Sequence, residues 1–211
     1  MTDVKICGIK EKNHLDVAAQ AGARFIGLVF YPKSPRFIDP EMARLLSRSA
    51  PTGVRMVGLF VDPDDAWLSH VLGAVPLDMI QLHGGESPVR VQEIRAHHHV
   101  PIIKAIPVAR PEDLEKTQEY EQVADWLLFD SKSQKSSVSG GSGISFDWKI
   151  LEGKRFKRPW MLSGGLNSEN IGEALSFLHP DAVDVSSGVE SEVGVKDPSR
   201  IIEFLKQVRQ H

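Results

Sequence analysis

The chain has 211 residues, of which 41% are hydrophobic and 25% are charged, and its formal net charge is −3. This composition is typical of a folded globular protein and excludes a disordered or collagen-like chain. With 25 basic and 28 acidic residues, the chain lacks the basic excess that a phosphate backbone requires, so we expect no nucleic-acid partner.

Short runs rich in Val, Ile, Leu and Phe recur along the whole chain, and each is followed by a longer amphipathic segment. Nearly continuous apolar runs of this kind are typical of parallel strands that are covered on both faces. In chain order, eight such strands are predicted, over residues 4–7, 25–30, 54–61, 79–82, 102–106, 126–129, 159–162 and 182–185.

Helices are expected between the strands. Asp39, Asp62 and Asn167 are interpreted as N-caps, and proline follows the first two directly, as is usual at a first helical position. A helix near the end of the chain is indicated by apolar residues at helical spacing, namely Ile201, Phe204, Leu205 and Val208.

The number of units suggests how the sheet is arranged. Eight strand and helix pairs in 211 residues correspond to about one pair per 26 residues, near the lower size limit of a (β/α)8 barrel. Alternation alone also fits an open, doubly wound sheet. Because the count reaches eight, we expect an α/β protein with one domain over residues 1–211, a closed (β/α)8 TIM barrel.

Cysteine content and apolar stretches bear on location. Cys7 is the one cysteine of the chain, so no disulfide can form within it. The start of the sequence lacks the apolar core of a signal peptide, and the longest apolar stretch, residues 25–31, is far shorter than the ~20 residues that cross a bilayer. We expect a cytosolic monomer without a membrane segment.

Three glycine-containing turns follow the last three predicted strands, at one quadrant of the barrel mouth. Glycine lets backbone N–H groups approach an anion closely, and the start of a helix after residue 166 would add partial positive charge. In barrels this quadrant is the usual phosphate site, although each turn alone is also explained as a simple exit from a strand. The residues expected to hold a phosphate-bearing ligand are Gly141, Ser142, Gly143, Ser163, Gly164, Gly165, Ser186, Ser187 and Gly188.

Two residues that can exchange protons end predicted strands. Cys7 ends the first strand and Asp130 the sixth, where a barrel presents side chains to its active site. A sulfur base and a carboxylic acid at one mouth suit the movement of protons between neighbouring carbon atoms. The alternatives are a small buried hydrophobe for Cys7 and a helix cap or ion pair for Asp130.

Other polar residues lie near the same strand ends. Gln81 and His83 end the fourth strand, Asp184 lies in the eighth, and Arg36 follows the second. The guanidinium fork of Arg36 is suited to binding a carboxylate by two hydrogen bonds, although a solvated loop charge fits as well. The histidines at 97–99 are interpreted as a solvated helix end, and we expect no metal site.

Six segments, in this order and spacing, complete the pattern: residues 5–9 (KICGI), 30–36 (FYPKSPR), 81–84 (QLHG), 141–148 (GSGISFDW), 162–167 (LSGGLN) and 183–190 (VDVSSGVE). Together they resemble the phosphoribosylanthranilate isomerases of tryptophan biosynthesis, from the first strand to the last. One departure is the serine-rich stretch at 133–139, which is longer than is usual in that family and which we expect to act as a mobile lid.

The resemblance implies conversion of N-(5-phosphoribosyl)anthranilate to 1-(2-carboxyphenylamino)-1-deoxyribulose 5-phosphate, an Amadori rearrangement without a cofactor. It implies that Asp130 is the general acid, Cys7 the general base and Arg36 the ligand of the anthranilate carboxylate. The three glycine turns correspond to the segments that bind the substrate phosphate. The pocket lining is implied to include Gln81, His83 and Asp184.

Three other functions are open from the sequence. The related sugar isomerase of histidine biosynthesis performs the same rearrangement, but is expected to have Asp in place of Cys7. An aldolase or epimerase on the same barrel would need a metal set or a Schiff-base lysine, for which Lys104 is the candidate. A phosphosugar-binding barrel without catalysis is the third, although it would need neither Cys7 nor Asp130.

Overall fold

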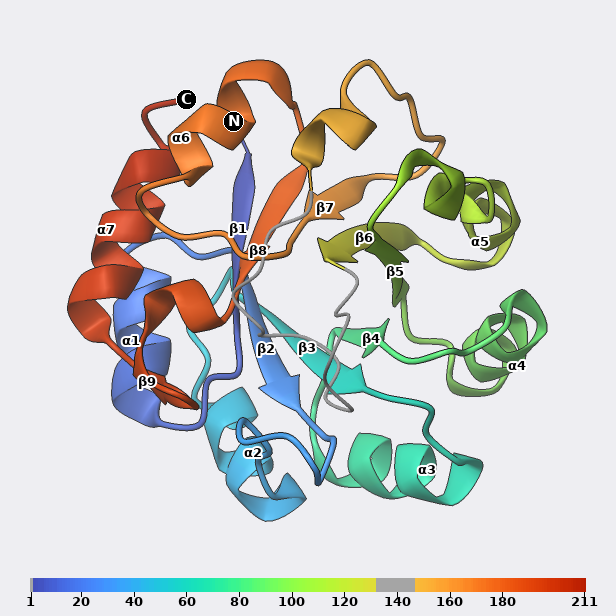
Figure 1. Ribbon diagram of the computed structural model, residues 1–211. Helices are drawn as coiled ribbons and strands as arrows, with labels where there is room; N and C mark the ends of the chain where they lie inside the picture. Colours follow the sequence, from blue (N-terminus) through green and yellow to red (C-terminus); the bar gives the residue numbers. More distant parts are fainter. Residues whose placement is uncertain (1, 132–146) are drawn as a thin grey trace.

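Eight parallel strands close into a barrel in the computed structural model, which describes residues 2–131 and 147–211 (Figure 1). Each strand pairs with the next, and β8 closes the barrel by pairing with β1. The expected TIM barrel is confirmed, and an open sheet is excluded. The strands are β1 (Asp3–Cys7), β2 (Phe25–Val29), β3 (Arg55–Phe60), β4 (Met79–Leu82), β5 (Ile102–Val108), β6 (Trp126–Ser131), β7 (Trp160–Leu162) and β8 (Ala182–Val185).

The described α-helices lie outside the barrel, as Figure 1 shows. They are α1 (Lys12–Gln20), α2 (Pro40–Arg48), α3 (Asp65–Ala74), α4 (Pro88–His98), α5 (Thr117–Val123), α6 (Ile171–Phe177) and α7 (Pro198–Val208). The four apolar residues predicted at helical spacing are all buried in α7. None of the described helices is long and apolar enough to cross a membrane.

Shorter elements complete the part of the chain that the structure describes. They are three 3-10 helices, η1 (Pro111–Leu114), η2 (Trp148–Leu151) and η3 (Ser187–Val189), and a hairpin of β9 (Glu190–Glu192) and β10 (Val195–Lys196). Between β6 and β7, the part of the segment that the structure describes contains η2 and no α-helix. The expectation that a helix follows every strand is therefore not met in the described part of that unit.

Side-chain caps decide where the helices begin. The Asp39 carboxylate caps α2, as predicted, by accepting a hydrogen bond from the main chain. The prediction for α3 is wrong, because the cap is Asp64, whereas Asp62 has a left-handed φ of 44°. The prediction for α6 is also wrong, because the Asn167 side chain accepts two main-chain hydrogen bonds within a turn, and the helix begins only at Ile171.

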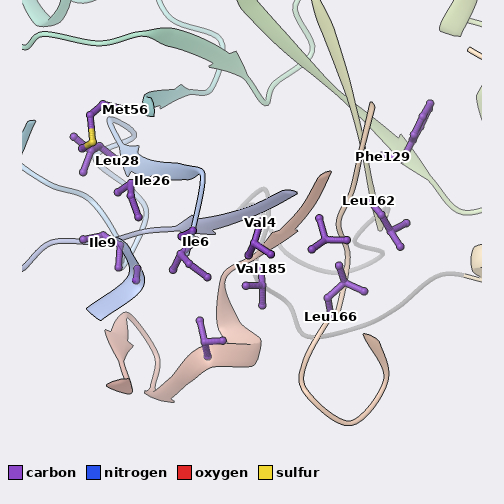
Figure 2. Packing of buried hydrophobic residues seen from close by; sticks show 14 of the residues in the cluster. Val4, Ile6, Ile9, Ile26, Leu28, Met56, Phe129, Leu162, Leu166 and Val185 are labelled. Atoms are coloured by element: carbon purple, nitrogen blue, oxygen red, sulfur yellow. The ribbon is translucent and has the colours of Figure 1, made fainter. Parts of the chain in front are cut away.

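Alternate residues of each strand face opposite sides of the barrel wall. The outer residues pack against the helices, and Figure 2 shows Val4, Ile6, Ile26 and Leu28 among this set. A second apolar cluster fills the barrel near the amino-terminal ends of the strands; its members are Phe25, Val57, Met79, Ile103, Ala105, Leu128, Met161 and Ala182. Since this plug closes one end, polar side chains inside the barrel gather toward the carboxyl-terminal end.

Candidate active site

A pocket opens at the carboxyl-terminal ends of the strands. Seven of the residues predicted from the sequence line it, namely Cys7, Arg36, His83, Asp130, Ser163, Asp184 and Ser186. Apolar side chains of β2, β3 and the loop after β3 also line the pocket, namely Val29, Leu59 and Val61, and Val29 and Leu59 pack with Cys7. The structure therefore brings the ends of β1, β4, β6, β7 and β8 around one space.

Cys7 lies next to a buried ion pair inside the barrel. Lys5 precedes it by two residues on β1, and Lys5 Nζ donates to Asp184 Oδ1 at 2.9 Å. Lys5 and Asp184 are also register partners on β1 and β8. Gly27 leaves room for this arrangement, since a Cβ there would lie 2.8 Å from Cys7 Sγ and 3.0 Å from Lys5 Nζ.

Opposing effects act on the ionisation of these groups. Burial raises the pKa of the Cys7 thiol, and the positive charge of Lys5 acts against that rise. Burial by itself would lower the pKa of Lys5, but the carboxylate of Asp184 and the Cys7 thiolate outweigh it and leave that pKa raised. The raised pKa favours the protonated form of Lys5, and its positive charge beside Cys7 is placed to stabilise a thiolate.

Asp130, the last residue but one of β6, lies on another side of the pocket. Its Oδ1 accepts a hydrogen bond from the Ser131 backbone amide at 2.8 Å, and its Oδ2 lies 3.0 Å from His83 Nε2. The other ring nitrogen, His83 Nδ1, lies 2.8 Å from Gln81 Nε2. Asp130 thus has a hydrogen-bond partner on each oxygen, and it lines the same pocket as Cys7.

Arg36 is buried and already bound to a carboxylate of the protein. Its Nε and Nη2 donate to the two oxygens of Glu190, both at 2.7 Å. Lys196 Nζ donates to Glu190 Oε1 at 2.7 Å, and the Gly194 amide donates to Oε2 at 3.1 Å. Burial would raise the pKa of Glu190, but the Arg36 fork and the Lys196 charge outweigh it and hold that pKa below its usual range.

The binding of Glu190 changes how Arg36 can meet a ligand. A guanidinium has two edges, and Glu190 takes the one formed by Nε and Nη2. Nη1 has no hydrogen-bond partner among the described residues, and Arg36 lines the pocket. The edge formed by Nη1 and Nη2 is therefore the one available to a second carboxylate.

A second, smaller pocket lies beside the first, between the ends of β6, β7 and β8. The predicted turn residues Ser163, Gly164, Gly165, Ser186 and Ser187 all line it. Gly164 and Gly165 have φ values of 90° and 71°, which side chains rarely adopt. Gly188 touches the neighbouring loop, and Gly141, Ser142, Gly143 and the stretch at 133–139 lie outside the described residues.

The comparisons decide the family. A family model for N-(5'phosphoribosyl)anthranilate (PRA) isomerase matches residues 4–207. The chain belongs to this family. The N-(5'-phosphoribosyl)anthranilate isomerase of Rhodospirillum centenum is 53% identical over 204 residues, which cover 96% of this chain and 95% of that protein.

Solved structures of phosphoribosylanthranilate isomerases agree with this assignment over their full length. Monomers generated from the dimeric isomerase of Thermotoga maritima give a TM-score of 0.86 at 37% identity, and cover 100% of both chains. An isomerase in complex with reduced 1-(o-carboxyphenylamino)-1-deoxyribulose 5-phosphate gives a TM-score of 0.85 at 35% identity, again with 100% of both chains covered. The present chain is thus an isomerase with the family's barrel.

Three charged residues near the site of this isomerase were given no role from the sequence. Lys5 had a recognisable signal, because a lysine inside an apolar strand, two residues before Cys7, must share its face of the strand. Glu190 and Lys196 carried no such signal, since they follow the last barrel strand, and Glu190 binds Arg36 and Lys196 only in the folded chain.

The aldolase alternative is not supported by the geometry. Lys104 Nζ is buried, lies 2.7 Å from Glu86 Oε2, and also donates to the carbonyl oxygens of Leu82 and Gly84. It is not among the residues that line the Cys7 pocket. In the part of the chain that the structure describes, no group of three potential metal ligands is found.

Proposed function

We propose that this chain converts N-(5'-phosphoribosyl)anthranilate to 1-(2-carboxyphenylamino)-1-deoxyribulose 5-phosphate. The observation that carries the proposal is that Cys7 and Asp130 line one pocket, with the glycine-lined pocket directly beside it. The family membership and the relative bound to the reduced product support it further.

The rearrangement needs one acid and one base. Asp130 donates a proton to the furanose ring oxygen, the bond from that oxygen to C1′ breaks, and the ring opens to a protonated imine. The imine makes the proton on C2′ acidic, and the Cys7 thiolate removes it. The electron pair left on C2′ forms the C1′–C2′ double bond of an enolamine, which tautomerises to the ketone with no net change in atoms.

The remaining residues bind the two ends of the substrate. Arg36 holds the anthranilate carboxylate with its Nη1 and Nη2 edge, since Glu190 occupies the other. The turns at 163–165 and 186–188, together with that at 141–143, hold the phosphate through backbone amides. His83 and Asp184 line the pocket, and Gln81 is buried with its Nε2 2.8 Å from His83 Nδ1.

Because burial raises the pKa of Cys7, only a minor fraction of this residue is ionised at neutral pH. The base is the thiolate, so each turnover proceeds through that minor fraction. Lys5 limits the cost of forming the thiolate, since its positive charge lies beside the sulfur.

Turnover of the substrate tests the proposal. The substrate is generated in situ from anthranilate and phosphoribosyl pyrophosphate by a coupling transferase, and its loss is followed by fluorescence. The aminoaldose of the histidine pathway is the parallel substrate. Turnover of the first alone is expected; turnover of the second alone would assign the rival pathway, and binding of a product analogue without turnover would favour a silent phosphosugar-binding barrel.

We further propose that the isomerase acts as a monomer in the cytosol. The T. maritima relative is described as dimeric, so the assembly state of this chain is measured directly by sedimentation equilibrium. A single species of 23.4 kDa is expected, and a species of twice that mass would overturn the expectation.

A further inference from the structure

Gln81 and His83 lie one above the other inside the barrel, because they are two residues apart at the end of β4. Gln81 is fully buried and is not among the residues that line the pocket, whereas His83 is. Gln81 Nε2 lies 2.8 Å from His83 Nδ1, and His83 Nε2 lies 3.0 Å from Asp130 Oδ2. The three side chains form one hydrogen-bonded series that leads from the barrel interior to Asp130.

The outer end of this series is fixed by the main chain. The Ser131 amide donates to Asp130 Oδ1 at 2.8 Å, so a proton on this carboxyl group belongs on Oδ2, the oxygen that faces His83. The His83 amide donates to the Phe60 carbonyl oxygen at 2.8 Å, which fixes the backbone from which the imidazole projects. The pair therefore has one geometry in which to share a proton.

The inner end is different, because Gln81 Oε1 is buried and has no hydrogen-bond partner among the described residues. A buried acceptor of this kind destabilises the folded protein unless it accepts a hydrogen bond. An amide keeps almost the same shape when its oxygen and nitrogen exchange places. Half a turn of the Gln81 amide would present Oε1 to His83 without breaking a second hydrogen bond.

Whether the His83–Asp130 pair holds an extra proton decides which atom of the Gln81 amide, Nε2 or Oε1, must face His83 Nδ1. When Asp130 is ionised and His83 neutral, the imidazole donates from Nε2 to the carboxylate, and Nδ1 accepts from Gln81 Nε2. When the pair gains a proton, on Oδ2 or on the imidazole, Nδ1 carries a hydrogen in both cases. It then needs an acceptor, and Gln81 Oε1 is the atom in place to serve.

We propose that Gln81 is a positioning residue for the Asp130 acid, which holds the His83–Asp130 pair in its protonated or its deprotonated form by turning its amide. The proposal rests on the acid role of Asp130 given above. Since Asp130 must gain a proton before each turnover and lose it to the ring oxygen, the pair passes through both forms in every cycle.

Other ionisable groups surround the pair without bonding to it. Those that line the pocket are Cys7, Tyr31, Arg36 and Asp184, and among the described residues none is hydrogen-bonded to His83 or Asp130. The flanking strands β3 and β5 present apolar side chains on the inner side, and Lys104 of β5 is paired with Glu86 at 2.7 Å. Gln81 is therefore the one described partner of His83 Nδ1.

Two replacements of Gln81 separate the functions of its amide. Gln81→Glu keeps the shape but offers only acceptors when ionised, so it favours Nδ1–H and the protonated pair. Gln81→Met keeps the length and removes both hydrogen-bonding groups, so neither form is favoured. Met79→Leu is the matched control, since Met79 is buried inside the barrel on the same strand and has no polar contact.

Nitrogen-15 NMR of histidine-labelled protein reads the proton position directly. His83→Asn identifies the His83 signals among the eight histidines. At about pH 8, where an ordinary histidine is neutral, we expect the Nε2–H tautomer in the wild type and in Met79→Leu. We expect Nδ1 to be protonated in Gln81→Glu and a mixture of tautomers in Gln81→Met.

Kinetics provide the second readout. The pH profile of kcat/KM has a limb on which the acid loses its proton, and in Gln81→Glu we expect this limb to move upward by about one pH unit. In Gln81→Met we expect kcat to fall about tenfold, with KM within about twofold of the wild type. Unchanged His83 signals and an unchanged pH profile in both variants would overturn the proposal. If Asp130→Asn keeps full activity, the acid assignment fails, while the NMR result still decides what Gln81 does to His83.

Discussion

Replacement of Gly188 by alanine is expected to damage the phosphate side of the site, because the loops after β7 and β8 touch there. A Cβ on Gly188 would lie 1.9 Å from the Leu166 carbonyl oxygen, 2.9 Å from the Leu166 carbonyl carbon and 3.0 Å from Asn167 Cα. All three are backbone atoms, so no side-chain rotation relieves the overlap. Restoring the 3.4 Å of ordinary contact requires the two loops to separate by about 1.5 Å.

This separation sets the size of the effect. Moving a binding group by about 1 Å costs on the order of 100-fold in catalytic efficiency, so kcat/KM of Gly188→Ala is expected to fall at least that far, mainly through KM. Overpacking of this kind also costs about 1–3 kcal/mol of stability, which leaves the barrel folded in a typical protein of this size.

Steady-state kinetics and thermal melts of Gly188→Ala and Gly73→Ala form the assay. Gly73 lies in α3, where a Cβ would meet nothing within 4 Å. The control substitution is expected to leave the kinetics unchanged and to stabilise the protein by about 0.5–1 kcal/mol. A folded Gly188→Ala protein with KM within about twofold of the wild type would refute the reasoning.

Three further outcomes are expected. Cys7→Ser should fold normally and lose kcat by orders of magnitude, since a hydroxyl is not ionised near neutral pH; a near wild-type kcat in the fluorescence assay would refute the base assignment. Lys5→Met should lower the free energy of unfolding by about 3–5 kcal/mol in urea titrations, because it leaves Asp184 buried and unpaired, and Lys5→Met with Asp184→Leu should recover much of the loss. In the wild type, the lowered pKa of Glu190 stabilises the folded protein fully above pH 4.5, the ordinary pKa of a glutamate, and this stabilisation is lost as the pH falls through the lowered pKa. Glu190→Gln should therefore show a flatter dependence of the free energy of unfolding on pH below about pH 4.5. Identical profiles for the two proteins would contradict the ion-pair argument.

The barrel was predictable from the sequence because its strands are covered on both faces and appear as unbroken apolar runs. The errors fell at helix starts. Asp62 and Asn167 both have side-chain oxygens that can accept from the main chain of a turn as well as of a helix, so their positions alone do not distinguish the two. The residues that decide between these uses, such as Asp64, are recognised only once the backbone is known.

The site was predictable to a different extent. Strand ends meet at one mouth in any barrel, so Cys7, His83 and Asp130 could be placed together from their positions in the strands. The choice of partners could not be predicted, because Lys5 binds a residue 179 positions away and Arg36 one that is 154 positions away. Such pairs depend on closure of β8 onto β1 and on the hairpin that follows β8.

The partners on the two sides of the pocket differ in a way that suits the reaction. The base must be reached in its ionised form, and its neighbour Lys5 is paired with Asp184 at 2.9 Å and has a raised pKa. The acid must gain and lose a proton in each cycle, and its neighbour His83 is an imidazole, which can donate or accept a hydrogen bond at either ring nitrogen. A fixed cation beside Asp130 would favour the ionised carboxylate and oppose its reprotonation. A neutral partner beside Cys7 would leave the negative charge of the buried thiolate without a stabilising positive charge. A fixed charge beside the base and an exchangeable proton beside the acid therefore allow both groups to work at one pH.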